Sequence, residues 1–284
     1  MALRSALLLG LLTGIFLAFG SFIGGKSGAL IALIMAGVMN FIAYFFSDKI
    51  VLAMSGAKPI SPEQAPALYN MVRELSQRAN IPMPKVYLIP SEQPNAFATG
   101  RSPSNGVVAV TSGLLNLLNE REVRGVIAHE IAHIKNRDIL VATIAATIAG
   151  AIGYLANFLQ FSMLFKSEDE ESQNPLSIVS SILMIIITPI IASLIQLAIS
   201  RSREYMADEV GAKISSDPLA LASALEKIEN YIHQIPEHVN PGTAHMYIAN
   251  PLSSGGLIEL LSTHPSTKKR IERLMRLGTA PRMF

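Results

Sequence analysis

The sequence of 284 residues contains no cysteine. Disulfide bonds and thiolate metal ligands are therefore excluded, and any metal ion must be held by histidine or carboxylate side chains. Charged residues are also scarce, at 15% of the chain, against about 25% in an ordinary soluble domain. The net charge is only +2 and no dense basic run occurs, so we expect no nucleic-acid partner. No nucleotide cofactor is evident either.

The apolar residues are concentrated in four long stretches. Half of all residues are hydrophobic, and the mean hydropathy is +0.39. The stretches cover residues 5–23, 29–46, 139–161 and 176–199, and none contains a charged residue. Each is long enough to cross about 30 Å of hydrocarbon as a helix. The pattern predicts four transmembrane helices, which form one hairpin within residues 1–47 and a second within residues 139–199.

Each predicted hairpin has an alternative. The first stretch has features of a cleaved signal peptide, because Arg4 precedes an apolar run that ends in small residues. Its length, and the second stretch that follows a turn at residues 24–27, favour a hairpin that stays in the membrane. The third and fourth stretches could instead form a buried hairpin in the core of a globular domain.

Basic residues predict how the chain is oriented. Residues 47–138 contain ten lysines and arginines, and residues 200–284 contain ten more. The loop between the third and fourth stretches has Lys166 as its one basic residue, against acidic residues at 168–171. Under the positive-inside rule both basic segments face the cytoplasm, and four spans place both chain termini there too.

Residues 48–138 and 200–284 are expected to form one cytoplasmic domain, which the second hairpin interrupts. Short apolar runs bounded by turn residues predict strands at residues 85–89, 95–99 and 107–111. Helical spacing and helix-start signals predict helices at residues 63–79, 114–119, 122–137, 203–215, 218–232 and 265–277. We therefore expect a predominantly α membrane protein with a cytoplasmic α+β domain that contains a small β-sheet.

The strongest chemical motif is His129-Glu130-Ile131-Ala132-His133. Residues four apart lie on the same face of a helix, so His129 and His133 can direct two imidazoles at one point. Zinc binds imidazole nitrogen at about 2.0–2.1 Å and favours four ligands in a tetrahedron. Glu130 lies beside that point, where its carboxylate can take a proton from a water that the metal activates. The motif is typical of zinc-dependent peptidases; the alternative is a chance pair on a solvated helix face.

A catalytic zinc site needs a third protein ligand and an open fourth position. The chain enters its third apolar stretch soon after His133, so this ligand must come from elsewhere. Glu204 and Asp208 lie four residues apart just after the fourth stretch, where the membrane hairpin would return the chain to the histidines. One carboxylate can bind the metal while the other accepts the N–H of a ligand histidine. The alternative is that both are surface acids paired with Arg201 or Arg203.

These motifs together resemble those of the HtpX-type membrane metalloproteases, which belong with the CAAX prenyl endopeptidases in one gluzincin family. The similar segments are HEIAH at 129–133, SRSREYMAD at 200–208, THPS at 263–266, the N-terminal hairpin, and residues 94–98 and 250–252. The resemblance implies that His129, His133 and Glu204 bind one zinc ion per subunit. Glu130 would then be the base, and Asp208 the partner of a ligand histidine.

The resemblance also implies a function and a location. The domain would be a gluzincin-type zinc metallopeptidase on the cytoplasmic face of a bacterial inner membrane, with polypeptides and the lipid bilayer as partners. It would act in quality control of damaged, misfolded or misassembled membrane proteins and in the stress response. One alternative is a proteolytically silent scaffold or adaptor with a structural zinc, which does not need Glu130. Another is a transporter, but the predicted spans lack the internal charges usual in ion pathways.

Two further assignments concern the substrate. His264 could donate a hydrogen bond to the oxyanion of the tetrahedral intermediate; the alternative is an ordinary histidine at the start of a helix. A candidate substrate-binding strand consists of Asn95, Ala96, Phe97 and Ala98. It could be an edge strand that pairs with an extended peptide by β-addition; the alternative is an ordinary strand of the sheet.

Overall fold

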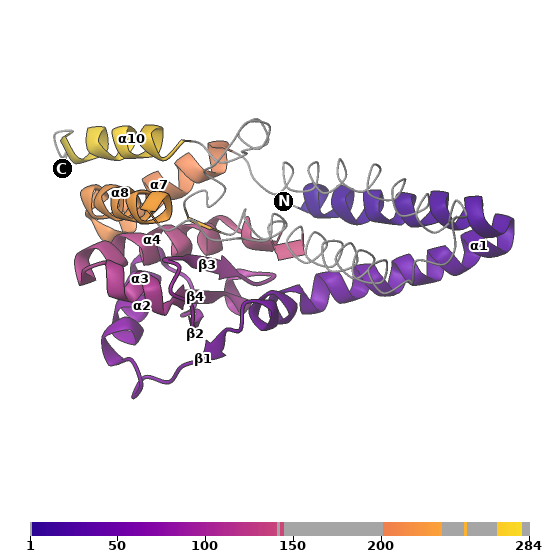
Figure 1. Cartoon of the computed structure of the whole chain (residues 1–284), viewed down its shortest axis with the longest axis horizontal. Helices are drawn as coiled ribbons and strands as arrows, with labels where there is room; N and C mark the ends of the chain where they lie inside the picture. The colour runs from indigo at the N-terminus through magenta and orange to yellow at the C-terminus, as the bar shows by residue number, and fades with distance from the viewer. Residues whose placement is uncertain (1, 141–142, 145–200, 235–246, 249–265, 280–284) are drawn as a thin grey trace, which may run out of the picture.

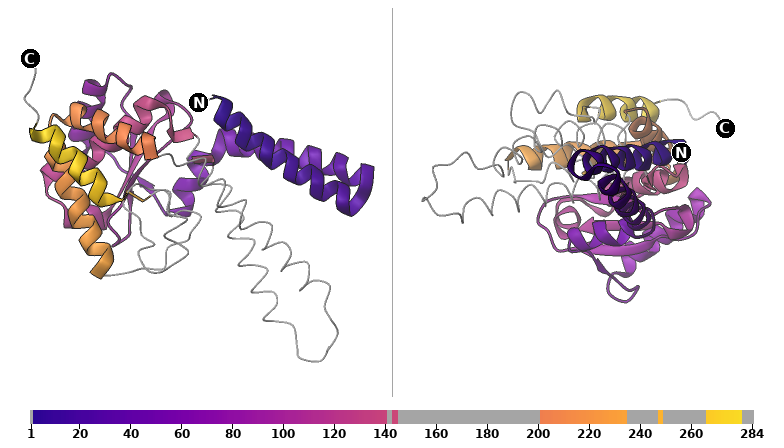
Figure 2. Two further views of the ribbon diagram at one scale, coloured as in Figure 1. Left: turned by 90° about the horizontal axis from the view of Figure 1, so that it is seen from above. Right: turned by 90° about the vertical axis from the view of Figure 1, so that its right-hand side faces the viewer.

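The computed structural model describes residues 2–140, 143–144, 201–234, 247–248 and 266–279. Within these ranges a small sheet and several helices form a domain, from which a long helical hairpin projects (Figure 1). The view from above shows the hairpin leaving one end of the domain (Figure 2). Nearly all of the third and fourth apolar stretches lie outside the described residues, so their structure stays a prediction.

The projecting hairpin is α1, Ala2–Met54, in which two helices join at a sharp reversal within a glycine pair. Gly25 has φ 55° and ψ −137° there, a conformation open to glycine and costly for other residues. The two arms lie side by side, and both ends of the hairpin are at the domain (Figure 1). Asn40 links the arms, because its amide donates to Thr13 Oγ1 at 2.8 Å and to the Leu9 carbonyl at 3.3 Å.

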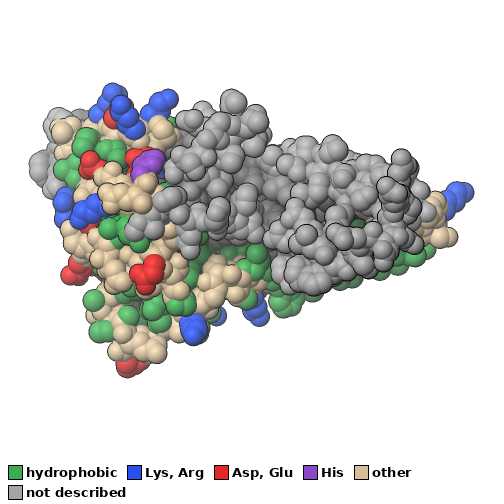
Figure 3. Space-filling view, in the orientation of Figure 1, with side chains coloured by type: hydrophobic (Ala, Val, Ile, Leu, Met, Phe, Trp, Pro, Cys, Tyr) green, Lys and Arg blue, Asp and Glu red, His purple; other side chains and the backbone are tan. Residues whose placement is uncertain are grey.

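Among the described residues, one helix, Gly24–Met54, is long and apolar enough to cross a membrane. Its most apolar window has a mean hydropathy of 2.2, and 17% of that window is buried. The core helix of a soluble domain would be mostly buried. In Figure 3 the strip of the hairpin that grey atoms leave visible is mainly hydrophobic apart from a polar and basic tip, whereas charged side chains gather over the domain. A membrane-embedded arm agrees with this surface, while the number of spans stays a prediction.

The sheet is mixed and has the strand order β1-β2-β4-β3. Its strands are β1 (Lys58–Pro59), β2 (Lys85–Ile89), β3 (Ala96–Thr99) and β4 (Val107–Thr111). β2 and β4 are parallel, and β1 and β3 add antiparallel at the two edges. β2 and β4 have the predicted bounds, and β3 begins one residue later than predicted. β1 is not predicted from the sequence, because it has only two residues, one of them proline, and so shows no alternating pattern.

The remaining described helices, apart from one short 3-10 turn, stack on one face of the sheet. They are α2 (Pro66–Ala79), the 3-10 helix η1 (Pro103–Asn105), α3 (Ser112–Leu117), α4 (Glu120–Asn136), α7 (Arg201–Ser215), α8 (Pro218–Gln234) and α10 (Thr267–Thr279). α2 and α4 lie on the sheet, and α7, α8 and α10 pack beyond α4 (Figure 1). The largest difference from the predicted bounds is at α2, where Pro66 occupies the first turn and begins the helix later than residue 63.

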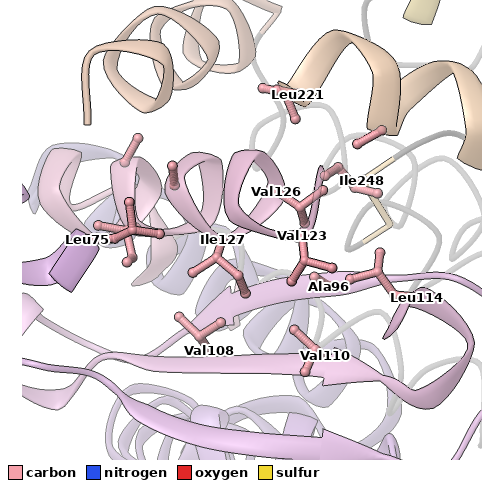
Figure 4. Packing of buried hydrophobic residues seen from close by; sticks show 14 of the residues in the cluster. Leu75, Ala96, Val108, Val110, Leu114, Val123, Val126, Ile127, Leu221 and Ile248 are labelled. Atoms are coloured by element: carbon pink, nitrogen blue, oxygen red, sulfur yellow. The ribbon is translucent and has the colours of Figure 1, made fainter. Parts of the chain in front are cut away.

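The two faces of the sheet are buried against different elements. Val108 of β4 packs in the main core with Val126 of α4 (Figure 4). Its neighbour Val107 points to the opposite face, into a second cluster with Val51 and Leu52 at the end of α1. The hairpin is therefore anchored on the sheet, on the face opposite α4.

Candidate metal centre

α4 carries the histidine motif and has well-defined ends. At its start Asn119 and Glu122 form a capping box, in which each side chain accepts the other residue's backbone N–H. At its end Arg137 adopts a left-handed conformation with φ 59°. His129 and Glu130 lie between these caps and are 1% and 5% exposed. The helix therefore holds both side chains inside the domain.

Three ligand atoms converge at one point. Nε2 of His129 and Nε2 of His133 are 3.1 Å apart. Glu204 of α7 completes a triangle of side chains: its Oε2 lies 3.6 Å from Nε2 of His129, and its Oε1 lies 3.6 Å from Nε2 of His133. Tetrahedral zinc with ligands at about 2.0–2.1 Å separates its ligand atoms by about 3.3 Å. The three side chains therefore fit zinc with only small shifts, and together they form a group able to hold a metal ion.

The position of Glu204 depends on close packing between α7 and α4. A Cβ added at Gly211 of α7 would lie 3.0 Å from both Cα and N of His129. Real Cβ atoms essentially never come closer than this, so glycine permits the approach. Gly211 lies two helical turns after Glu204 on the same face of α7. The contact therefore sets the distance from Glu204 to the histidines.

Each histidine is held through its other ring nitrogen by a buried carboxylate. Nδ1 of His129 lies 3.0 Å from Oδ1 of Asp208, and Nδ1 of His133 lies 3.1 Å from Oδ2 of Asp138. A proton on Nδ1, donated to the carboxylate, leaves Nε2 free to bind a metal. Asp208 contacts His129, and the side chains of Asp208 and Glu204 are only 3% and 13% exposed, which favours the metal-site interpretation over that of two surface acids. Sequence reasoning missed Asp138, which follows the helix end and has no helical-spacing signal.

Sequence reasoning also missed a buried guanidinium beside the metal centre. Arg270 of α10 is 2% exposed and donates to both oxygens of Asp208, at 2.9 and 2.7 Å. Its Nη2 lies 3.3 Å from Nε2 of His129, and its Nη1 lies 3.7 Å from Glu204. The available signal is its place on the buried face of α10, with Leu274 one turn on. An arginine on such a face requires an acidic partner inside the protein.

The charges of the site shift the pKa values of its groups. Burial raises the pKa of Glu130. Burial opposes charge on His133, but Asp138 and Glu204 outweigh it and raise the pKa of His133 to about 10. Burial also acts to raise the pKa of Glu204, yet the charges of His133 and Arg270 hold it well below its usual range. Protonated imidazole therefore balances the acids, and a metal cation would displace those protons.

Glu130 also contacts the edge of the sheet, since its carboxylate accepts a hydrogen bond from the backbone N–H of Ala98 in β3. Asn95 directs its carbonyl toward β4, where it accepts the N–H of Thr111 at 2.9 Å. The backbone N–H and C=O groups of successive residues in a strand point to opposite edges, so those of Ala96 and Ala98 point away from β4. Among the described strands, β3 has β4 as its one neighbour. The other edge of β3 faces the metal centre.

The structure brings together most of the residues predicted from the sequence. His129, His133 and Glu204 form the ligand triangle, and Asp208 and Glu130 lie next to it. The segment 95–98 forms or precedes the edge strand, as predicted. His264 lies outside the described residues, so its role stays a prediction.

Comparison with known proteins agrees with this arrangement. The sequence profile of Peptidase family M48 matches residues 62–277. The chain is 62% identical over 269 residues to a protease HtpX homolog of Aquifex aeolicus, covering 93% of this chain and 89% of the relative. It is 54% identical to a protease HtpX homolog of Pyrococcus furiosus, covering 97% of this chain and 95% of the relative.

A solved structure shares the fold. The crystal structure of S. mikatae Ste24p superposes with a TM-score of 0.52 at 19% sequence identity. The alignment covers 93% of this chain, which spans 62% of the length of Ste24p. At this identity the likeness concerns the fold alone.

Proposed function

Because the chain belongs to peptidase family M48 and is a membrane-bound metallopeptidase, we propose that His129, His133 and Glu204 hold one zinc ion and that Glu130 is the base in peptide hydrolysis. The observation that carries this proposal is the convergence of the three side chains beside a buried carboxylate, with the two Nε2 atoms 3.1 Å apart and each of them 3.6 Å from one of the two oxygens of Glu204. Three protein ligands leave the fourth position of a tetrahedral metal open for water or substrate.

A zinc ion held by these three residues would supply Lewis acidity, which would make a water molecule easier to deprotonate and would polarise the scissile carbonyl. Asp208 and Asp138 keep the two imidazoles oriented with Nε2 toward the ligand triangle. Glu130 takes the proton of the attacking water and passes it to the leaving amine. Burial, which raises the pKa of Glu130, strengthens it as a proton acceptor. His264 is the candidate donor to the oxyanion.

We propose that an extended peptide substrate pairs with the free edge of β3. The backbone groups of Ala96 and Ala98 point outward from this edge, which is the direction that pairing with another strand requires. Ala98 also contacts Glu130, so a peptide paired there would place its carbonyl near the base. Asn95 and Phe97 are 5% and 6% exposed and would position the strand from inside the domain.

The proposed substrates are damaged, misfolded or misassembled membrane proteins, cleaved at the cytoplasmic face of a bacterial inner membrane as quality control under stress. The relatives named protease HtpX homolog support this proposal. So does α1, whose apolar arm ends against the sheet that carries β3. Four spans with both termini in the cytoplasm belong to the same proposal. The comparisons give no support to a proteolytically silent scaffold.

Replacing the base tests the mechanism. Glu130→Gln keeps an oxygen that accepts the Ala98 N–H, so we expect the variant to fold and to bind zinc. Cleavage of casein should fall by about 10²–10⁴-fold, because amide oxygen is not a useful base. Glu120→Gln is the matched control, since Glu120 is exposed on the same helix. Wild-type cleavage by Glu130→Gln, with metal content unchanged, would rule out Glu130 as the base.

A further inference from the structure

The buried guanidinium of Arg270 makes contacts in two directions. On one side Nε and Nη2 donate to the two oxygens of Asp208, which itself contacts Nδ1 of His129. On the other side Nη1 donates to the carbonyl of Ile248 at 2.8 Å. A planar guanidinium presents its N–H groups in a fixed fork, so both contacts constrain each other's position. Arg270 therefore connects the metal centre to the backbone of Ile248.

The backbone N–H of the same residue, Ile248, is held by the residue that precedes β3. The N–H of Ile248 donates to Oδ1 of Asn95 at 3.2 Å. Asn95 is in turn fixed to β4, because its own N–H donates to Oγ1 of Thr111 at 2.8 Å and its carbonyl accepts from Thr111. The side chain of Ile248 lies in the main core near Val126 and Ala96 (Figure 4). The contact to Asn95 is therefore part of a packed region.

These contacts form one continuous path from a metal ligand to the proposed substrate strand. The path consists of His129, Asp208, Arg270, Ile248 and Asn95. We propose that Arg270 is a positioning residue that fixes the orientation of His129 and the position of β3 together. The inference rests on the proposed function, because it takes β3 as the strand that binds the peptide. A displacement of His129 would then displace β3, and a displacement of β3 would displace His129.

The charge of Arg270 and its hydrogen-bond geometry have opposite effects on metal binding. Nη2 lies 3.3 Å from Nε2 of His129, so the positive charge of Arg270 disfavours a metal cation there. Its hydrogen bonds through Asp208 favour the metal, because they orient the imidazole. Arg270→Lys keeps the charge and removes the fork, and so isolates the positioning effect. Arg273→Lys is the matched control on the same helix, since Arg273 pairs with the exposed Glu209.

The test uses the full chain in detergent. We would measure the visible spectrum of the cobalt-substituted protein, the zinc affinity by competition with a chromophoric chelator, and kcat and KM for an extended peptide. For Arg270→Lys we expect an altered cobalt spectrum, a loss of about 10–100-fold in zinc affinity, and a raised KM. For Arg273→Lys we expect wild-type values. A wild-type spectrum and KM in Arg270→Lys would overturn the proposal.

If Arg270→Lys does not fold, a second variant tests the coupling between the metal centre and β3. Asn95→Ala removes the link to Ile248 without touching a metal ligand. We expect it to shift the cobalt spectrum and to raise KM, whereas an unchanged spectrum would show that β3 and the metal centre are not coupled. The spectra do not depend on turnover. Failure of the wild-type protein to cleave the peptide would therefore contradict the proposed function and leave the positioning test intact.

Discussion

The tight contact between α4 and α7 makes Gly211→Ala an informative perturbation of the metal centre. The added Cβ would lie 3.0 Å from Cα and N of His129, and 3.2 Å from the carbonyl carbon of Ala128. All three are backbone atoms, which cannot rotate aside as a long side chain can. α7 must therefore move away from α4, and it carries Glu204 with it.

The size of the effect follows from two opposing terms. An alanine in a helix interior is normally favoured over glycine by about 1 kcal/mol. Overpacking a core contact costs about 1–3 kcal/mol, and rigid backbone neighbours place the cost in the upper part of that range. We expect a net loss of about 1–2 kcal/mol in the free energy of unfolding. Restoring an ordinary carbon contact requires a shift of about 0.5 Å, which lengthens the 3.6 Å distances from Glu204 to the histidines.

Two assays check this prediction. The apparent Tm of the detergent-solubilised protein should fall by roughly 2–8 °C, and zinc affinity should fall by about tenfold or more. Gly37→Ala is the control, because a Cβ at Gly37 on α1 meets no atom within 4 Å. It should leave zinc affinity unchanged. If Gly211→Ala keeps the wild-type Tm and zinc affinity, the packing argument for the position of Glu204 is wrong.

Two further predictions concern the histidines. Asp138→Asn should weaken zinc binding by about 10–100-fold, because it weakens the hydrogen bond that orients His133. The control is Asp217→Asn, which changes a surface pair with Arg121 and should leave zinc binding unchanged. Equal effects of the two variants would count against the role of Asp138. The pH dependence of stability in the metal-free protein follows from His133, whose pKa is about 6.5 in the unfolded chain and about 10 in the folded one. Protonated His133 therefore stabilises the fold fully below pH about 6.5, and the protein should lose this stability as the pH rises toward about 10. Thermal unfolding after chelation measures this loss, and a metal-free protein whose stability rises over this range would contradict it.

Local patterns account for the part of the site that the sequence predicted. His129 and His133 are four residues apart on one helix, and so are Glu204 and Asp208, so spacing alone places each pair on one face. The apolar runs of β2 and β4 are bounded by turn residues, and their predicted ends agree with the structure. The reversal at Gly25 is likewise marked by a glycine pair.

The missed residues depend on contacts that no local pattern records. Asp138 reaches His133 only because Arg137 adopts a left-handed conformation and turns the chain back past the helix end. Arg270 lies on a helix far along the chain, and its partner Asp208 is brought near by the packing of α10 on α7. Spacing within one helix cannot predict such a pair, since both the burial and the partner come from the tertiary fold.

The most direct test of the central claim is to measure bound metal and casein cleavage together, before and after treatment of the purified protein with a chelator. We expect one zinc ion per chain, loss of cleavage when zinc is removed, and recovery when zinc is added back. Full cleavage by protein that contains no metal would contradict the account.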